Sequence, residues 1–269
     1  MIAIFMSIVL AAPGSVMKTG GLPPMLLNPG GVIAETSGGL PANMGAVMTQ
    51  VVALPGATFG LGVVDLNTGE RLTRNATRRF YIDTPDIVNA AVCVVRSNSG
   101  EFPLDSLVSR NEQLWQVASR GQQGAREATQ SIIYYMGGIE HIESWLASSG
   151  HSTTRFQGVQ LDWGGAPQVA ASYTTVEDCL DFIEIVAGSL DNTAVRRMAK
   201  NPPLSADLEA ALGTSNVVYG WVSGRGDTRC LNFIISRPDG AKYGISVLTN
   251  DLCCPAKADL GFSMIWDAL

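Results

Sequence analysis

The sequence has few charged residues, only two histidines and no cluster of basic residues, and these shortages exclude several classes of function. Charged residues make up 16% of the 269 residues, and the formal net charge is −6. Phosphate binding requires clustered lysine and arginine side chains, so a nucleic-acid surface is not expected. The histidines, His141 and His151, are too few and too poorly placed to indicate a metal centre. We therefore expect neither a metal nor another cofactor.

The five cysteines lack the paired spacing of a zinc site, which leaves two interpretations open. In an oxidising compartment one disulfide is expected. Its best candidate joins Cys230, at the start of an expected strand, to Cys253 or Cys254, just past the end of the partner strand. The alternative is that the cysteines are buried free thiols.

The first residues include an apolar run that is too short to span a membrane as a stable helix. Residues 2–12 are interrupted only by Ser7 and precede Pro13-Gly14-Ser15. This pattern is typical of the apolar part of a signal peptide, although no basic residues come before it. We expect residues 1–39 to be a signal peptide and a Gly- and Pro-rich linker. The mature protein is then secreted, or periplasmic in the cell envelope, without a stable membrane span.

The remaining residues have a globular composition, 46% hydrophobic, and can bury a substantial core. The patterns predict a helix over residues 41–53, then a strand over 57–66 in which apolar residues alternate. Asn67 and Gly69 favour a hairpin turn into a second strand over residues 70–75.

The middle of the chain is predicted to be helical. Helices are expected over residues 85–95, 125–136 and 138–148. Thr174-Thr175-Val176-Glu177 has the pattern of a capping box, in which Thr174 caps a further helix. Three more strands are expected over residues 216–222, 230–237 and 243–249, followed by a helix that begins at Pro255.

Tight hairpins join antiparallel strands, so the expected sheet is antiparallel. The first two strands and the last three are expected to pair across the helical block. A cleft between the sheet and the helical block is the default ligand site.

Three segments of the chain resemble the serine β-lactamase and penicillin-binding protein family, most closely the class A β-lactamases. They are residues 60–70, residues 137–156 and residues 221–249. The resemblance implies an α/β (α+β) three-layer sandwich with a five-stranded antiparallel sheet flanked by helices. An all-helical lobe is inserted between strands 2 and 3. It also implies one domain over 40–269, with a sheet lobe of 40–79 plus 205–269 and a helical lobe of 80–204.

The family's first catalytic motif, Ser-x-x-Lys, supplies a nucleophile and an activating lysine. In this chain its frame falls on Thr84-Pro85-Asp86-Ile87. Thr84 keeps a hydroxyl, but its β-branch hinders attack. Ile87 cannot exchange a proton, and a hydroxyl without a base is a poor nucleophile at neutral pH. Asp86 is interpreted as an acidic residue in the first turn of a helix rather than as a substitute base.

The family's other motifs are also altered. The Ser-Asp-Asn position falls on Gly124-Ala125-Arg126, which offers no proton shuttle. The Lys-Thr-Gly position falls on Val222-Ser223-Gly224, which keeps the glycine and loses the lysine. Arg225 and Arg229 are interpreted as solvated surface arginines, with substitution for that lysine as the alternative. The stretch corresponding to the family's omega loop, residues 157–173, contains Asp162 but no glutamate.

These losses favour a catalytically degenerate, secreted protein that keeps the scaffold for a binding or structural role. Its partner would be peptidoglycan, a peptide or a protein bound in the cleft between the lobes. The alternative is an active hydrolase of β-lactams, peptides or esters that uses Thr84 or Ser223. A third possibility is an unrelated secreted α/β protein, in which the first and last strands would not share one sheet.

Overall fold

The computed structural model describes residues 39–82, 86–107, 112–122, 126–155, 172–200, 202–224 and 226–269, with only the backbone at 86, 120–122 and 126–130. All of these residues fall within one compact unit, Glu35–Leu269. The predicted signal peptide and nearly all of the predicted linker lie outside the described residues.

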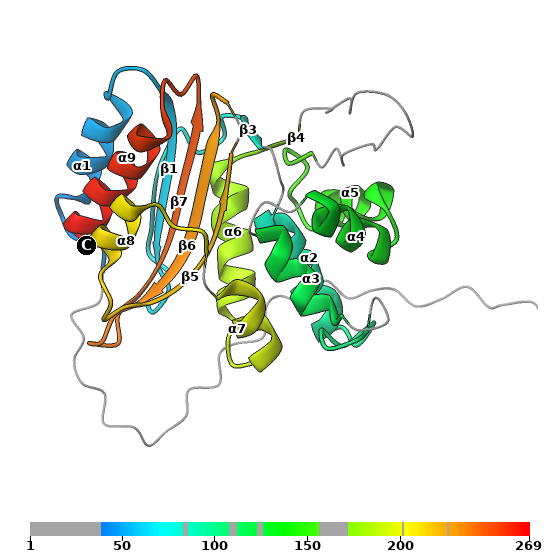
Figure 1. Cartoon of the computed structure of the whole chain (residues 1–269). Coiled ribbons are helices and arrows are strands. Elements are labelled where there is room, and N and C mark those ends of the chain that lie inside the picture. The colour runs from blue at the N-terminus through cyan, green and yellow to red at the C-terminus, as the bar shows by residue number, and fades with distance from the viewer. Residues whose placement is uncertain are drawn as a thin grey trace, which may run out of the picture. The chain divides into compact units, whose positions relative to one another are not determined.

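A five-stranded sheet with the order β2-β1-β7-β6-β5 organises this unit (Figure 1). Its strands are β1 (Thr58–Asp65), β2 (Arg71–Arg74), β5 (Val217–Ser223), β6 (Arg229–Ser236) and β7 (Lys242–Asn250). Every neighbouring pair is antiparallel. Because β1 pairs with β7 along its whole length, from Thr58 opposite Asn250 to Asp65 opposite Tyr243, the first and last strands share one sheet, as predicted.

One face of the sheet is covered by the N- and C-terminal helices of the unit (Figure 1). These are α1 (Met44–Val52), α8 (Ala206–Leu212) and α9 (Pro255–Ala268). Fully buried apolar side chains fill the layer between helices and sheet, among them Met48, Phe59, Phe233 and Phe262. Phe233 and Phe262 meet edge to face with ring centroids 4.9 Å apart. Non-directional burial of this kind supplies most of the driving force for folding.

A second buried core lies on the opposite face, under α6 (Val176–Ala187) and the other helices. Gly60 and Gly62 of β1 allow α6 to approach, because a Cβ atom at either position would lie within 2.8 Å of a Val176 side-chain atom. The helices beyond α6 are α2 (Asp86–Asn98), α3 (Leu114–Gln122), α4 (Arg126–Tyr135), α5 (Ile139–Ser148) and α7 (Thr193–Ala199). Helices on both faces of the sheet make the three-layer arrangement that was predicted.

The inserted block also contains a feature that the sequence patterns did not indicate. Two short strands, β3 (Phe80–Ile82) and β4 (Ser172–Thr174), pair as a separate antiparallel sheet, so the block is not entirely helical. Each has only three residues, which is too short for an alternating pattern to stand out from its surroundings. The rest of the predicted architecture is confirmed.

The start of α6 corrects the predicted capping box by one residue. The N-cap is Thr175, whose hydroxyl accepts a hydrogen bond from the Asp178 amide at 3.1 Å. Thr174 ends β4, and its hydroxyl lies 2.8 Å from that of Thr154. Both threonines are followed three residues later by an acidic residue, Glu177 or Asp178, so the sequence could not decide between them.

The predicted disulfide is wrong, because none of the five cysteines forms a disulfide. Cys230 is opposite Leu248 in the sheet, and its side chain belongs to the core under α6. Cys253 lies in the loop after β7, where its amide donates to the Gly56 carbonyl at 2.8 Å. Cys230 therefore lies in the core, whereas Cys253 is exposed in a loop beyond the end of β7, and no disulfide joins them.

This arrangement predicts that two thiols react with a colorimetric thiol reagent in the native protein and all five after unfolding. Cys253 and Cys254 are exposed, whereas Cys93, Cys179 and Cys230 are buried. Burial raises the pKa of Cys93 and that of Cys179 to about 12, which removes the reactive thiolate at neutral pH. If three or fewer thiols react after unfolding without reductant, two of the cysteines form a disulfide and the assignment of five thiols is wrong.

Candidate functional site

The chain enters the candidate site along β3, which side-chain hydrogen bonds hold at the end of the large sheet. Asn250, the last residue of β7, accepts a hydrogen bond from the Tyr81 amide at 3.1 Å and donates to the Arg79 carbonyl at 3.4 Å. The next described helix is α2, which packs against both α6 and β5. These contacts bring the helix of the first motif to the strand of the third.

Ile87, at the position of the family's activating lysine, lies in the core. Its side chain is only 4% exposed and belongs to the buried cluster that also contains Trp221 and Cys230. An aliphatic side chain at this position contributes apolar burial and no ionisable group. Thr84 lies outside the described residues, and only the backbone of Asp86 is described.

The second motif is only partly placed. Gly124 lies outside the described residues, and Arg126 is the first residue of α4, described for its backbone alone. Because α4 packs against α3 and α2, this position belongs to the inserted block, as predicted. Asp162, in the stretch that corresponds to the omega loop, is outside the described residues.

The third motif lies at the end of β5, the strand at one edge of the sheet. Val222, at the lysine position, packs against the core under α1, α8 and α9. Ser223 is opposite Cys230 in the β5–β6 pairing. Gly224 is fixed by a close backbone approach, because a Cβ atom there would lie 2.5 Å from the Thr228 carbonyl oxygen. The glycine is therefore required by the hairpin itself, whether or not a ligand lies beside it.

Arg229 is not the solvated surface arginine that was predicted. Its guanidinium lies 2.9 Å from a carboxylate oxygen of Asp259 on α9, and the two side chains are only 18% and 4% exposed. Asp259 also accepts a hydrogen bond of 2.7 Å from Ser205, the N-cap residue of α8. Asp259 thus joins β6, α8 and α9, and Arg229 does not replace the missing lysine. Arg225 lies outside the described residues.

A buried polar network links the end of α5 to the start of α6. Asp178 accepts a hydrogen bond of 2.5 Å from the Thr154 hydroxyl, and its other oxygen lies 3.2 Å from His151 Nδ1. His151 also packs on Phe182, with ring centroids 4.7 Å apart. From the sequence His151 was interpreted only as a poor metal ligand, and this network was not predicted. A usable signal was present, because a histidine follows Gly150 at the end of a predicted helix and three hydroxyl residues come directly after it.

His151, Asp178 and Asp181 offer ligand atoms within 4.8 Å of one another, the geometry of a candidate metal site. Protein groups already bind two of these carboxylates. Thr154 bonds to Asp178, and the Arg71 guanidinium lies 2.7 Å from Asp181. A metal ion would have to displace these partners, so the network is better described as structural.

Asp178 predicts a pH dependence of stability. Burial alone would raise the pKa of its carboxyl, but hydrogen bonds from His151 and Thr154 outweigh burial and lower the pKa. The carboxylate form therefore stabilises the fold above its unfolded pKa of about 3.9, and this contribution is lost as the pH falls through the lower folded value. We expect the advantage of the wild type over Asp178→Asn in urea unfolding to shrink between about pH 5 and pH 3. A difference in unfolding free energy between the wild type and Asp178→Asn that stays constant over this range would contradict a stabilising role for the ionised Asp178 carboxylate.

Asn89, two residues beyond Ile87 on α2, is a buried polar group. It is 3% exposed, and neither its amide oxygen nor its amide nitrogen makes a hydrogen bond to any residue that the structure describes. An unpaired buried amide costs about 1–3 kcal/mol, so such groups are commonly satisfied by a water molecule or a ligand.

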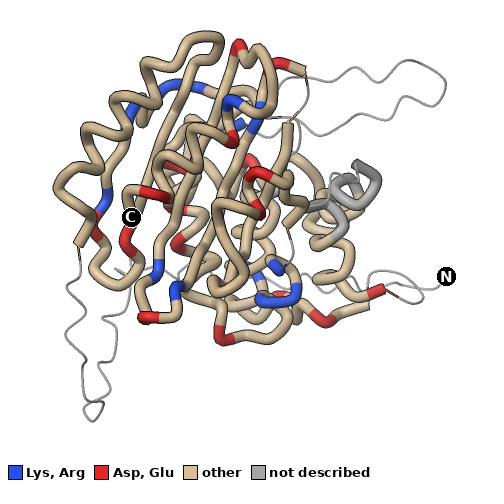
Figure 2. Tube along the Cα trace, turned by 60° about the vertical axis from the view of Figure 1, so that its left-hand side comes forward, with Lys and Arg blue, Asp and Glu red and all other residues tan. Residues whose placement is uncertain are grey.

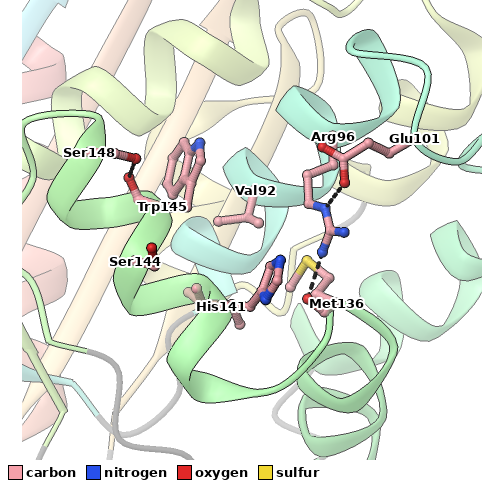
Figure 3. A pocket seen from close by; sticks show the side chains of 9 residues that line it. Val92, Arg96, Glu101, Met136, His141, Ser144, Trp145 and Ser148 are labelled. Carbon is pink, nitrogen blue, oxygen red and sulfur yellow. Dashed lines mark hydrogen bonds and ion pairs between the residues drawn. The ribbon is translucent and has the colours of Figure 1, made fainter. Parts of the chain in front are cut away.

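Two pockets of the described residues lie within the helical block, away from the motif positions. One, of about 250 Å³, is lined by residues of α2 and α5 together with Met136 (Figure 3). Its Arg96 is already bound, with Nε 2.6 Å from Glu101 and a short hydrogen bond to the Met136 carbonyl. The other, of about 320 Å³, includes Trp115 and Arg197. Neither is lined by Ile87 or by residues 222–224.

Charge does not concentrate on one face of the described residues. Lys and Arg positions are scattered among Asp and Glu positions (Figure 2). In the described part of the chain, moreover, no helix combines the length and the apolar character needed to cross a bilayer.

Comparison with solved structures identifies the fold. The chain matches a β-lactamase from Xanthomonas campestris with a TM-score of 0.66 and 19% identity, over 84% of this chain and 95% of that one. It matches an ancestral class A β-lactamase with a TM-score of 0.67 and 17% identity, over 84% and 98%. A β-lactamase from Chitinophaga pinensis gives a TM-score of 0.68 and 14% identity, over 84% and 99%. This chain has the class A β-lactamase fold.

The low identity means that this likeness establishes the fold alone. No protein-family model matches the sequence. No curated protein matches it. The β-lactamase fold nevertheless accounts for the antiparallel sheet, the helices on both of its faces and the inserted block, as the resemblance implied. Function has to be argued from the site rather than from the fold.

Proposed function

We propose that this protein of the β-lactamase fold is catalytically degenerate and acts by binding rather than by hydrolysis. The observation that carries the proposal is the burial of Ile87 in the core at the position of the activating lysine. Without a neighbouring base, the hydroxyl of Thr84 stays protonated and is a weak nucleophile at neutral pH.

The third motif supports the same conclusion. The side chain of Val222 packs against the other core, and Arg229, the next described basic residue along the chain, is bound to Asp259. A substrate carboxylate would therefore find no cation at the lysine position. In the family that this chain resembles, both positions carry a lysine. In this chain both are apolar packing positions, so the chain lacks both the activating lysine and the lysine that attracts a substrate carboxylate.

The proposed binding site is the cleft between the sheet and the inserted block, with a peptidoglycan fragment, a peptide or a segment of a partner protein as its ligand. Cosedimentation with purified peptidoglycan tests the first of these ligands. If the protein is retained in the pellet and soluble peptidoglycan fragments release it, peptidoglycan is identified as the ligand. If the protein stays in the supernatant, peptidoglycan is excluded.

Turnover of a chromogenic cephalosporin separates this proposal from the alternative of an active hydrolase. We expect no rate above that of buffer at pH 7. A rate that Thr84→Ala or Ser223→Ala abolishes, in a variant that keeps its unfolding transition, would assign hydrolysis to that hydroxyl and overturn the proposal.

We also propose that the protein works outside the cytoplasm. The apolar run of residues 2–12 and the small residues after it support export. Expression of the full chain in a Gram-negative host tests this, because an exported protein would be recovered from the periplasm with a shortened N-terminus. Full-length protein confined to the cytoplasm would contradict it.

A further inference from the structure

Cys253 and Cys254 form an exposed pair of thiols in the loop between β7 and α9. Their sulfur atoms lie 3.8 Å apart, so both side chains point the same way. The other three cysteines are buried. A soluble reagent or ion in the native protein therefore meets these two sulfurs together.

The loop that carries the pair is held by the rest of the fold. The Cys253 amide donates to the Gly56 carbonyl at 2.8 Å, and the preceding Leu252 amide donates to the Asp227 carbonyl at 2.8 Å. Immediately after the pair, Pro255 begins α9, for which Cys254 is the N-cap residue. Backbone contacts therefore hold the main chain that carries the two cysteines, and their sulfurs lie close together on it.

This spacing fits chelation of a metal ion. Two thiolates bound to a tetrahedral zinc-type ion, each at about 2.3 Å, lie about 3.8 Å from each other. The pair in the structure therefore needs little rearrangement to bind such an ion.

Oxidation fits the same spacing less well. Adjacent Cα atoms are about 3.8 Å apart across a trans peptide, whereas the Cα atoms of ordinary disulfides are about 4.4–6.8 Å apart. A bond between Cys253 and Cys254 would distort the peptide that joins them, and the backbone contacts of the loop resist that distortion. A strained disulfide is also readily reduced.

We propose that Cys253 and Cys254 form a binding site for a thiophilic bivalent cation of the zinc or cadmium type. The two thiols release their protons to solvent as the sulfurs bind the ion, and water molecules complete the tetrahedral coordination. The proposal does not depend on the function proposed for the cleft. It assigns a metal site to a chain in which none was predicted.

Titration of the reduced full-length protein with Cd²⁺ under an inert atmosphere tests the site. The near-ultraviolet charge-transfer band of a cadmium–thiolate bond is expected to grow until one ion is bound per chain. Zn²⁺ is expected to compete with Cd²⁺ and suppress the band. Loss of one sulfur turns chelation into binding by a single ligand, so Cys253→Ser and Cys254→Ser are each expected to weaken binding about a hundredfold or more.

Both variants change exposed side chains, and the near-ultraviolet circular dichroism of the fold reports whether they stay native. Cys253→Ser/Cys254→Ser is expected to give no band. A band of wild-type strength in that double variant, or wild-type affinity in either single variant, would overturn the proposal. So would a loss of two mass units in air that occurs in the presence of saturating Cd²⁺, because it would show that the pair prefers oxidation to chelation.

Discussion

Ile87→Lys is expected to lower the free energy of unfolding by about 3–5 kcal/mol, the range found when a charge is left unpaired in a protein interior. Ile87 is 4% exposed, and the residues around it in the cluster are apolar. A lysine there would have to bury its ammonium group, lose its proton or push the start of α2 away from the sheet. Each of these outcomes lowers the stability of the fold, and urea unfolding measures the decrease in the free energy of unfolding.

Two control variants separate the cost of charge from the cost of substitution. Ile87→Val removes one methylene group and is expected to cost about 0.5–1.5 kcal/mol. Val217→Lys places the same charge on β5, where the side chain is 49% exposed, and is expected to change stability by less than about 0.5 kcal/mol. A loss of less than about 1 kcal/mol in Ile87→Lys would show that this position can hold a lysine. The argument from packing would then fail.

Asp259→Ala is expected to destabilise the protein by about 3–5 kcal/mol, because it leaves the Arg229 guanidinium without its carboxylate. The pair is 2.9 Å apart, with side chains 18% and 4% exposed. The same substitution removes the 2.7 Å hydrogen bond from Ser205, which caps α8. Chemical denaturation of the single variants and of the double variant gives the coupling energy.

The double variant Arg229→Met/Asp259→Leu supplies the matched control. Because it removes both charges and keeps similar volumes, most of the lost stability is expected to return. Glu101→Ala removes a partner from the Arg96–Glu101 pair, in which Glu101 is 48% exposed, and is expected to cost much less stability than Asp259→Ala. Equal losses in Glu101→Ala and Asp259→Ala would show that burial does not decide the cost.

The long elements of this fold could be predicted from the sequence because each carries its own periodicity. The alternation of residues 57–66 predicted β1, and the hairpin signal at Asn67 and Gly69 predicted its antiparallel pairing with β2. The first two strands were expected to pair with the last three across the inserted block, but the patterns did not show that β1 is the strand that meets β7. Local patterns hold no information about partners that distant in the chain.

The features that could not be predicted depend on contacts between distant segments. Strands β3 and β4 are three residues long and exist because they pair with each other. Arg229 was expected to be solvated, since nothing near it in the sequence indicates that Asp259 on α9 lies against it. The same limit explains the wrong disulfide, because the order of the strands along the chain does not show that Cys230 is buried and Cys253 exposed.

The candidate site was predicted in part. Ile87 and Val222 were identified as positions that had lost a lysine, and the structure adds that both contribute to apolar packing. Asn89 was missed, because an asparagine inside a helix is not unusual until its burial is known. The network of His151, Thr154 and Asp178 was missed for the same reason.

The central claim, that the hydroxyl at the nucleophile position does not react, is tested most directly by intact mass after incubation with a fluorescent penicillin. Acylation would add the mass of the penicillin whether or not turnover follows, so the measurement does not depend on a rate. We expect the mass of the wild-type protein to stay unchanged, as for Thr84→Ala. An adduct on the wild type that maps to Thr84 and is absent from Thr84→Ala would contradict the account.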